Sequence, residues 1–396
     1  MFFPYPWQDP KAYCKTPRHK TRRQEQRRYS HRIIRMNPLR AATRILFVLS
    51  LLISDLHADP RPERTIPDGS DTRDRFLKLI ARPQVPLAPH ERTPSSSDGL
   101  TEIGFDFVAE ANQRVPGLMI KPSSSPESVK RPVVIVLHGT GSDKLAMKPW
   151  LKKIAAEGLN AVAFDARHSG ERATFGKGSD AYRAALFETW KSGRDFPFLY
   201  DTVWDLMRLI DYLQTRPDVD PERIAAIGFS KGGTELYLAA AADPRLVASV
   251  SCIGVQSFEW ALENQAWHSR IATIQSAVEG AAADAGLSSV DTAFVRRFYR
   301  RVAPGLDHEF DGPRMLPLIA PRPLLVINGD RDDRTPRAGV ELCISAAKVA
   351  YRQQQAENQF EFLVQENVGH AVTPQSEKYA LEWLKKQLKS PQAHKR

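Results

Sequence analysis

The segment around Ser230 has the residue types and the spacing of a nucleophile turn. It reads Gly228-Phe-Ser-Lys-Gly232, a Gly-x-Ser-x-Gly motif, and lies between an apolar run at 224–227 and a helical pattern at 234–242. A serine on a sharp strand-to-helix turn is held in a strained conformation, and flanking glycines remove side chains that would clash there. The hydroxyl then lies at a helix N-terminus, where the helix dipole stabilises developing negative charge. The spacing therefore predicts Ser230 as a nucleophile.

Two further groups that such a nucleophile needs follow Ser230 in the chain. His370 comes after an apolar run at 360–364 and can accept the Ser230 proton and return it to a leaving group. A carboxylate would orient this histidine and stabilise its cation. Three aspartates after the apolar run at 324–327 compete for that role: Asp330, Asp332 and Asp333. The chain order Ser, Asp, His is one in which a catalytic triad occurs.

Backbone amides near the predicted nucleophile can stabilise the charge that develops on a substrate's carbonyl oxygen. The apolar run at 133–137 ends in His138-Gly-Thr-Gly141, a small-residue loop of the kind that supplies one such amide, and the residue after the nucleophile supplies another. We therefore predict an oxyanion hole formed by the amides of Thr140 and Lys231. An ordinary glycine turn is the alternative for the loop, and the Lys231 side chain is expected to be solvated.

Short apolar runs separated by helical patterns must position these residues. The runs are continuous rather than alternating, which is typical of strands buried on both faces of a parallel sheet, and they lie at 133–137, 161–164, 224–227, 247–250 and 324–327. Helical spacing at 201–213 and 374–388 predicts helices on both faces of this sheet. Alternating stretches at 101–109 and 114–120 predict a β-hairpin before it, and the run at 360–364 predicts a last strand.

The connection between the runs at 247–250 and 324–327 is longer than a crossover needs. We predict a helical insertion at about 256–318, on the sheet edge where ligands bind in open α/β folds. Its Trp260 and Trp267 either pack between helices or line a substrate pocket. Two charged residues after the run at 161–164, Glu171 and Arg172, either contact substrate or form an ion pair that fixes their loop. His138 is a further candidate for substrate contact.

Charge and cysteine content exclude several classes of protein. Residues 1–44 hold twelve Lys or Arg and two acidic residues, so they carry the whole formal net charge of +10 and the body is neutral. This argues against a basic nucleic-acid-binding body. Three cysteines without a CxxC pair support neither a zinc ribbon nor a disulfide framework, and we expect Cys252 and Cys343 to be buried thiols rather than a bridge. No metal or cofactor is expected.

The N-terminal residues match a secretory signal. An apolar run of ten residues at 45–54 follows Arg40 and Arg44, and it is too short for a bilayer, which takes roughly twenty. Read from Met36, a signal peptide spans 36–58 and is cleaved after Ala58, so we expect a secreted or periplasmic protein without a stable membrane anchor. An uncleaved anchor, a disordered basic tail and a transit peptide are the alternatives, and the true start, Met1 or Met36, stays open.

Three other segments complete the predicted organisation. Residues 1–35 form a basic extension, and residues 59–98 form a Pro-rich linker with one short helix around 71–81. The body of the protein is expected at 99–390.

The motifs in this body resemble the α/β-hydrolase superfamily, specifically its dienelactone-hydrolase- and acetyl-xylan-esterase-like branch, which includes uncharacterised bacterial and plant serine hydrolases. The resemblance rests on HGTG at 138–141, RHSGER at 167–172, DTVWDL at 201–206, DVDPERI at 218–224, GFSKGG at 228–233, APRPLL at 320–325 and GH at 369–370. It implies an α/β-hydrolase fold and a serine hydrolase of short acyl or acetyl esters, including esters of carbohydrates. The branch's Gly-x-x-Asp-x-x-x-Pro pattern, aligned on Gly329 and Pro336, selects Asp332. Dienelactone hydrolases proper have cysteine where Ser230 stands, which favours ordinary esters over lactones.

Two other functions fit part of the pattern. Peptidases of the prolyl-oligopeptidase type share this core and triad, but they usually carry a large propeller, and the roughly 40 residues between Ala58 and the first hairpin cannot form one. A non-catalytic binding protein on a hydrolase scaffold is disfavoured by the complete set Ser230, Asp332 and His370, since decay usually removes a member. We therefore expect an ester hydrolase whose partner is a small-molecule or carbohydrate ester.

Overall fold

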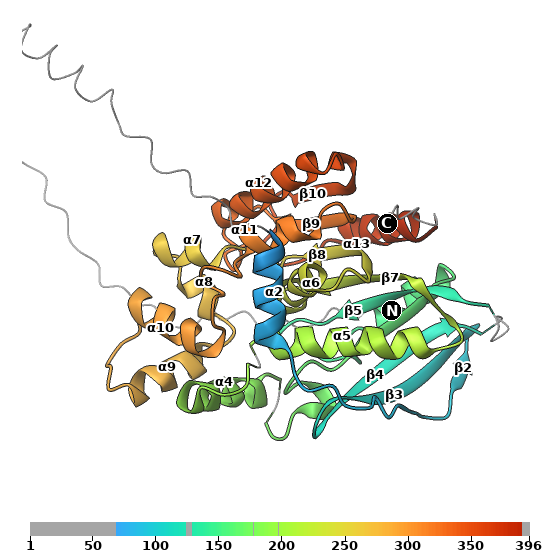
Figure 1. Cartoon of the computed structure of the whole chain (residues 1–396), viewed down its shortest axis with the longest axis horizontal. Coiled ribbons are helices and arrows are strands. Elements are labelled where there is room, and N and C mark those ends of the chain that lie inside the picture. Colours follow the sequence, from blue (N-terminus) through green and yellow to red (C-terminus); the bar gives the residue numbers. More distant parts are fainter. Residues whose placement is uncertain (1–68, 124–128, 177, 197, 390–396) are drawn as a thin grey trace, which may run out of the picture. The chain divides into compact units, whose positions relative to one another are not determined.

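The computed structural model describes residues 69–123, 129–176, 178–196 and 198–389 (Figure 1). The predicted basic extension and signal peptide, and the first ten residues of the predicted linker, lie outside the described residues. Within the described part of the chain, no helix is both long enough and apolar enough to cross a membrane.

A mostly parallel sheet of ten strands forms the centre of the described structure. The strand order is β1-β3-β4-β6-β5-β7-β8-β9-β10, with β2 paired to β3. Six strands pair in parallel: β5 (Arg131–Leu137), β6 (Asn160–Phe164), β7 (Val219–Phe229), β8 (Leu246–Cys252), β9 (Leu324–Gly329) and β10 (Phe360–Gln365). The first five contain the continuous apolar runs that predict a parallel sheet, and β10 is the predicted last strand. Because the strands are parallel, the loops after β5, β7, β9 and β10 all emerge at one edge of the sheet.

The predicted hairpin extends this sheet at one side. Strands β3 (Leu100–Glu110) and β4 (Gln113–Pro122) are antiparallel, and β4 also pairs antiparallel with β6. The alternation in β3 places Phe105 and Phe107 in the core, where both rings stack near Tyr212. Two short strands, β1 (His90–Glu91) and β2 (Ser95–Ser97), pair with β3.

Helices cover both faces of the sheet, because successive residues of its strands point to opposite sides. In β5, Val133 and Ile135 belong to one buried core, and Val134 and Val136 belong to another. The first core is closed by α2 (Gly69–Ile80), α5 (Tyr200–Thr215), α6 (Lys231–Ala242) and α12 (Arg337–Gln353), of which α2, α5 and α6 lie in front of the sheet in Figure 1. The second is closed by α3 (Lys148–Ala156) and α13 (Pro374–Lys389).

Residues 69–98 are part of this body, so the predicted linker boundary at residue 98 is wrong. Helix α2 buries Phe76 and Ile80 completely, and both side chains belong to the same core as α5 and α6. The prolines and polar residues of this segment are typical of a linker. The two apolar side chains, four positions apart on one face of α2, are sufficient to dock it on the sheet.

The predicted insertion is helical, with α7 (Phe258–Glu263), α8 (His268–Ile271), α9 (Gln275–Asp284), α10 (Thr292–Val302), α11 (Gly312–Met315) and the 3-10 turn η4 (Leu316–Ile319). It packs on α4 (Asp180–Ser192), where the Trp190 ring contacts Phe294 and Phe298 at centroid distances of 5.3 and 6.0 Å. Two more 3-10 turns, η3 (Gly170–Arg172) and η5 (Glu357–Gln359), precede α4 and β10.

The start of the insertion is held by Asp311. Its carboxylate accepts hydrogen bonds from the Ser257 hydroxyl (2.5 Å) and from the Phe258 amide (2.7 Å). Burial raises the pKa of this carboxyl to about 6, although these hydrogen bonds oppose the shift. The two cysteines within the described residues, Cys252 and Cys343, are buried free thiols, as predicted.

Candidate active site

Ser230 occupies the turn between β7 and α6, with φ 54° and ψ −118°. A side chain on Gly228 would place its Cβ 2.2 Å from the Gly232 carbonyl oxygen, and one on Gly232 would lie 2.6 Å from the carbonyl oxygens of Leu137 and His138. Both positions of the Gly-x-Ser-x-Gly motif therefore require glycine. The close backbone approach holds Ser230 in the strained conformation that the spacing predicts and presents its hydroxyl above the sheet edge.

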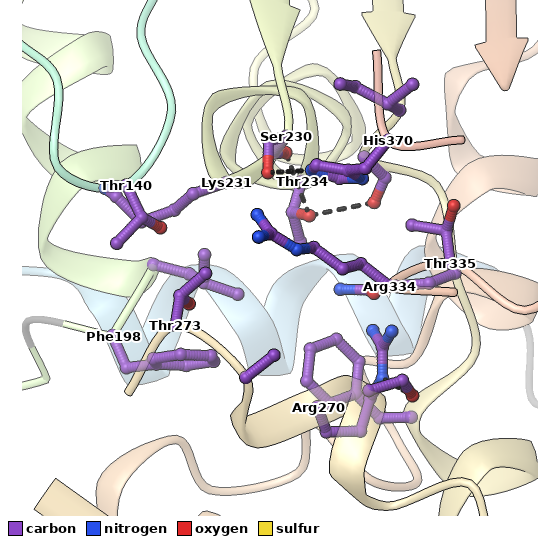
Figure 2. Close-up of a pocket in the computed structure, with 17 residues that line it drawn as sticks. Thr140, Phe198, Ser230, Lys231, Thr234, Arg270, Thr273, Arg334, Thr335 and His370 are labelled. Carbon is purple, nitrogen blue, oxygen red and sulfur yellow. Dashed lines mark hydrogen bonds between the residues drawn. The ribbon is translucent and has the colours of Figure 1, made fainter. Parts of the chain in front are cut away.

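The structure brings together Ser230, His370 and Asp332. The Ser230 Oγ lies 2.8 Å from His370 Nε2, and His370 Nδ1 lies 2.8 and 3.0 Å from the two carboxylate oxygens of Asp332 (Figure 2 shows the first two residues). With its proton on Nδ1, the imidazole donates to Asp332, and Nε2 accepts the Ser230 hydroxyl hydrogen. The arrangement can pass a proton from the serine to the histidine.

The environment of Asp332 keeps its carboxylate ionised. Burial alone would raise the pKa of this carboxyl, but hydrogen bonds from His370, the Thr335 hydroxyl and the Arg334 amide outweigh burial and hold the pKa below its ordinary range. The other two candidate aspartates lie elsewhere. Asp330 accepts a hydrogen bond from the Val368 amide, and Asp333 is exposed. The pattern shared with the branch therefore selects the aspartate that contacts the histidine.

A small cavity of about 60 Å³ opens beside Ser230 and His370. Figure 2 shows Thr140 and Lys231 on one side of it, with Phe198 from the segment before α5 below them. The helical insertion also lines the cavity, with Phe258, Ser269, Arg270 and Thr273 among others. The predicted insertion therefore contributes directly to the pocket.

The structure places the two predicted oxyanion residues at this cavity. Lys231 is the first residue of α6, where backbone amides have no partner within the helix. Its side chain does not extend into solvent as expected, because Nζ pairs with the carboxylate of Glu235 and lies 5.2 Å from the centre of the Tyr182 ring. Glu235 is one turn further along α6 and is also buried, so the pair links the first two turns of the helix.

None of the five residues predicted to contact substrate lines this cavity. His138 is buried; its Nδ1 lies 2.8 Å from the Gly139 carbonyl oxygen, to which it donates, and Nε2 accepts from the Ala166 amide. Burial, with a smaller effect of the Lys231 charge, lowers the pKa of His138 to about 4. The imidazole is therefore neutral, and it connects the loop that follows β5 to the loop that follows β6.

Glu171 and Arg172 form ion pairs, but with other residues. Glu171 pairs with Lys144 at 2.6 Å, and Arg172 pairs with Asp205 at 2.6 Å. Lys144 also pairs with buried Asp165 at 2.6 Å, which fixes the segment just after Thr140. The ion-pair alternative for Glu171 and Arg172 therefore describes this segment better than substrate contact. The two residues pair with Lys144 and Asp205, however, and not with each other.

The two tryptophans of the insertion have different surroundings. Trp260 packs against Gly339 of α12. A Cβ atom added at Gly339 would lie only 3.2 Å from the indole ring. Trp267 lines a second hollow of about 620 Å³ between α8 and α9. Ala272 lines both this hollow and the cavity beside Ser230, so the two are adjacent.

Sequence reasoning missed two arginines of the cavity, Arg270 and Arg334. Arg334 lies two residues after Asp332, and a charged residue so close to a candidate triad member is a usable signal. Arg270 falls within the insertion, where no motif marks it. Among the described residues, no group of three or more His, Cys, Asp or Glu side chains is arranged to hold a metal ion.

The sheet, the strand-to-helix turn of Ser230 and the contacts to His370 and Asp332 define an α/β-hydrolase. The family model described as "Glucuronyl esterase, fungi" matches residues 118–354, and the chain belongs to this family. This confirms the predicted fold and superfamily.

Individual relatives agree with this assignment. A putative hydrolase of Bacillus subtilis, YtaP, is 28% identical over 186 residues, which are 47% of this chain and 53% of the relative. The match thus spans about half of that relative's length. Acetyl xylan esterase 1 from Thermoanaerobacterium has the same fold, with a TM-score of 0.59 and 18% identity over 81% of this chain and 94% of that chain. The glucuronoyl esterase from Solibacter usitatus has the same fold, with a TM-score of 0.54 and 16% identity over 80% of this chain and 91% of that chain. The two structures show the shared fold, and the family match supports a hydrolase that acts on ester bonds.

Proposed function

We propose that this protein is a serine hydrolase that cleaves carboxylic esters through an acyl-enzyme. The observation that carries the proposal is the continuous set of contacts from Ser230 through His370 to Asp332 beside the small cavity. Membership of the glucuronyl esterase family supports the same chemistry.

In the first half of the reaction, Ser230 Oγ attacks the ester carbonyl carbon while its proton moves to His370 Nε2. The negative charge on the carbonyl oxygen is bound by the backbone amides of Lys231 and Thr140. Asp332 stabilises the imidazolium that forms. His370 then gives its proton to the alcohol oxygen, the bond from that oxygen to the carbonyl carbon breaks, and the acyl group stays on Ser230.

In the second half, a water molecule replaces the alcohol. His370 takes one proton from the water while the water oxygen attacks the acyl carbon, and the same two amides bind the oxyanion. When the bond between the acyl carbon and Ser230 Oγ breaks, His370 returns the proton to Ser230. The carboxylic acid leaves, and the enzyme is restored.

The dimensions of the site favour a short acyl group on a larger alcohol. The cavity of about 60 Å³ is several times the roughly 10–15 Å³ that a cavity needs, on the same measure, to hold one water molecule, and it is about a tenth of the adjacent hollow. The adjacent hollow is larger, and Trp267 gives it an aromatic wall beside the polar side chains of Gln275 and Glu279. Such a combination can hold a sugar, and the carbohydrate esterases with the same fold support an ester of a carbohydrate as the substrate.

Replacing the nucleophile tests the proposal. Ser230→Ala should reduce kcat for p-nitrophenyl acetate by at least about 10⁴-fold, because the covalent step is lost while binding remains. The control is Ser192→Ala, since Ser192 is exposed at the end of α4 and its substitution should leave kcat unchanged. Circular dichroism checks that both variants fold.

A fluorophosphonate probe gives an independent measurement on the same pair of variants. The wild type and Ser192→Ala should form an adduct on Ser230, identified by peptide mass. If Ser230→Ala keeps more than a tenth of the wild-type turnover, or if the wild type forms no adduct, the proposed mechanism is wrong.

A further inference from the structure

Two arginines from different segments line the cavity. Arg334 comes from the loop after β9, and Figure 2 shows its side chain extending across the pocket below Ser230 and His370. Arg270 comes from α8 of the insertion and lies below Arg334 in the same view. Both line the cavity together with Ser230 and His370. Two positive charges therefore lie beside the proposed nucleophile.

Neither guanidinium has a carboxylate partner within the described structure. The side chain of Arg334 makes no hydrogen bond or ion pair with the described residues, and only its backbone amide contacts Asp332. Arg270 is 6% exposed; its Nε donates to the Ser269 hydroxyl at 3.0 Å, and its Nη2 is buried without any partner. The Phe258 ring lies 5.2 Å from the Arg270 guanidinium, which shields one face without neutralising the charge.

The nearby carboxylates are already engaged. Asp332 accepts from His370 and from Thr335, and Asp311 accepts from Ser257 and from backbone amides. Burial lowers the pKa of the Arg270 guanidinium, and the nearby carboxylates of Asp311 and Asp332 only partly oppose that shift. An arginine nevertheless stays protonated at neutral pH. The cavity therefore has an uncompensated positive charge that the protein itself does not neutralise.

Burying an unpaired charge is costly, and an orphaned buried donor is rare in native proteins. Such a cost is offset when an anion binds, and the planar guanidinium matches a carboxylate with two parallel hydrogen bonds. We propose that Arg270 and Arg334 bind a carboxylate of the substrate, so that the enzyme prefers esters with a negative charge near the scissile carbonyl. This inference rests on the proposed ester hydrolysis and names its substrate class.

The carboxylate can belong to either part of the ester, and paired substrates distinguish the two. Monomethyl succinate against methyl butyrate places the charge on the acyl side. The 4-acetoxybenzoate anion against 4-acetoxybenzamide places it on the alcohol side. The wild type should show at least a tenfold higher kcat/KM for the anionic member of one pair. Equal values within both pairs would overturn the proposal.

Variants then assign the preference to the arginines. Arg334→Gln should lower the anionic-to-neutral ratio of kcat/KM about 10- to 100-fold, the range expected for a hydrogen bond between charged groups. Arg334→Lys keeps the charge and should retain part of the preference. The matched control is Arg337→Gln, an exposed arginine of α12 paired with Glu341, which should leave the ratio unchanged. Arg270→Gln provides the second test should either Arg334 variant misfold. An unchanged ratio in folded Arg334→Gln or Arg270→Gln would contradict the inference.

Binding to the inactive Ser230→Ala variant separates this inference from the proposed function. Calorimetric titration should show monomethyl succinate or 4-acetoxybenzoate binding at least tenfold more tightly than its neutral counterpart, and adding Arg334→Gln should remove the difference. Such selective binding without turnover of any ester by the wild type would contradict hydrolysis and still support the anion site. Turnover without charge selectivity in either assay would support hydrolysis and overturn the anion site.

Discussion

Two of the regions of this protein that hold arginines contrast with each other: in one the arginines meet carboxylates, and in the other they do not. The paired cluster lies between the loop after β6, β3 and α5, and it consists of Arg82, Arg167, Arg172, Glu110, Asp201 and Asp205. The other region is the cavity with Arg270 and Arg334. The same side-chain type is used for support in the first region, and we propose that it is used for binding in the second.

The paired cluster balances three positive side chains with three negative ones. Arg167 makes two hydrogen bonds to Asp205, at 2.9 and 3.1 Å, and a third contact to Glu110 at 2.8 Å. Burial alone would raise the pKa of the Asp205 carboxyl, but Arg167 and Arg172 outweigh it and hold the pKa below its ordinary range. Each charge is satisfied within the protein, so the cluster fixes the loop after β6 on α5 without a ligand.

The comparison shows that burial alone does not indicate what a charged residue does. A buried arginine with its carboxylates in place contributes to the fold, and removing one member leaves charges without partners. A buried arginine without carboxylate partners lowers the stability of the free protein, and the binding of an anion restores that stability. The two regions should therefore respond in opposite directions to the same substitution.

The largest effect on stability is expected in the paired cluster. Arg167→Met leaves Asp205 and Glu110 with fewer partners at a buried site, so the free energy of unfolding should fall by about 3–5 kcal/mol. Urea denaturation followed by circular dichroism measures this change. As the control, Arg114→Met removes an exposed pair with Asp106 and should cost less than about 1 kcal/mol. A loss for Arg167→Met no larger than this control would show that the cluster does not support the fold.

The effect on stability expected from His138 is intermediate in size. It arises because burial keeps this side chain uncharged in the folded protein. Its pKa is about 4 in the folded protein and near 6.5 in the unfolded chain, so the unfolded chain binds more protons between these values. The contribution of His138 to stability is therefore complete above pH 6.5 and is lost as the pH falls toward 4. The loss is on the order of 3 kcal/mol across this range.

Urea denaturation between pH 7 and 4.5 measures the loss, and His138→Gln, which cannot take up a proton, should reduce the slope. His168 has a pKa lowered to about 4 by burial and by Arg172 and Arg167, so it adds a slope of the same sign that this variant retains. Identical slopes for the wild type and a folded His138→Gln would contradict the assignment.

The smallest effect on stability is expected at the cavity. Arg270→Met replaces an unpaired buried charge by an apolar side chain of similar length, so the free energy of unfolding should stay unchanged or rise by up to about 1 kcal/mol. Urea denaturation of Arg270→Met and Arg167→Met under the same conditions compares their free energies of unfolding directly. A loss as large as that of Arg167→Met would mean that Arg270 supports the fold, and the contrast between the two regions would not hold.

Local patterns in the sequence were sufficient to predict most of the parallel strands and the turn that presents Ser230. A strand buried on both faces needs a continuous apolar run, and the nucleophile turn needs small residues on both sides of the serine. The linker prediction at 59–98 was wrong beyond residue 69, because composition does not show whether a short amphipathic helix finds a core to dock on. The expectation for the Lys231 side chain was wrong for a related reason, since its partner Glu235 is identifiable only once α6 is placed.

The sequence by itself determined which residues could act as nucleophile, acid and base, because their types and their positions after predicted strands are local properties. Residue types alone left three aspartates open, the resemblance to the branch selected Asp332, and the structure shows that Asp332 contacts His370. Only the tertiary structure decided that Arg270 of the insertion reaches the same cavity as Arg334. The members of these two pairs lie 38 and more than 60 positions apart in the chain. The packing of the insertion on the sheet edge determines which charges keep a partner, and no local pattern in the chain encodes that.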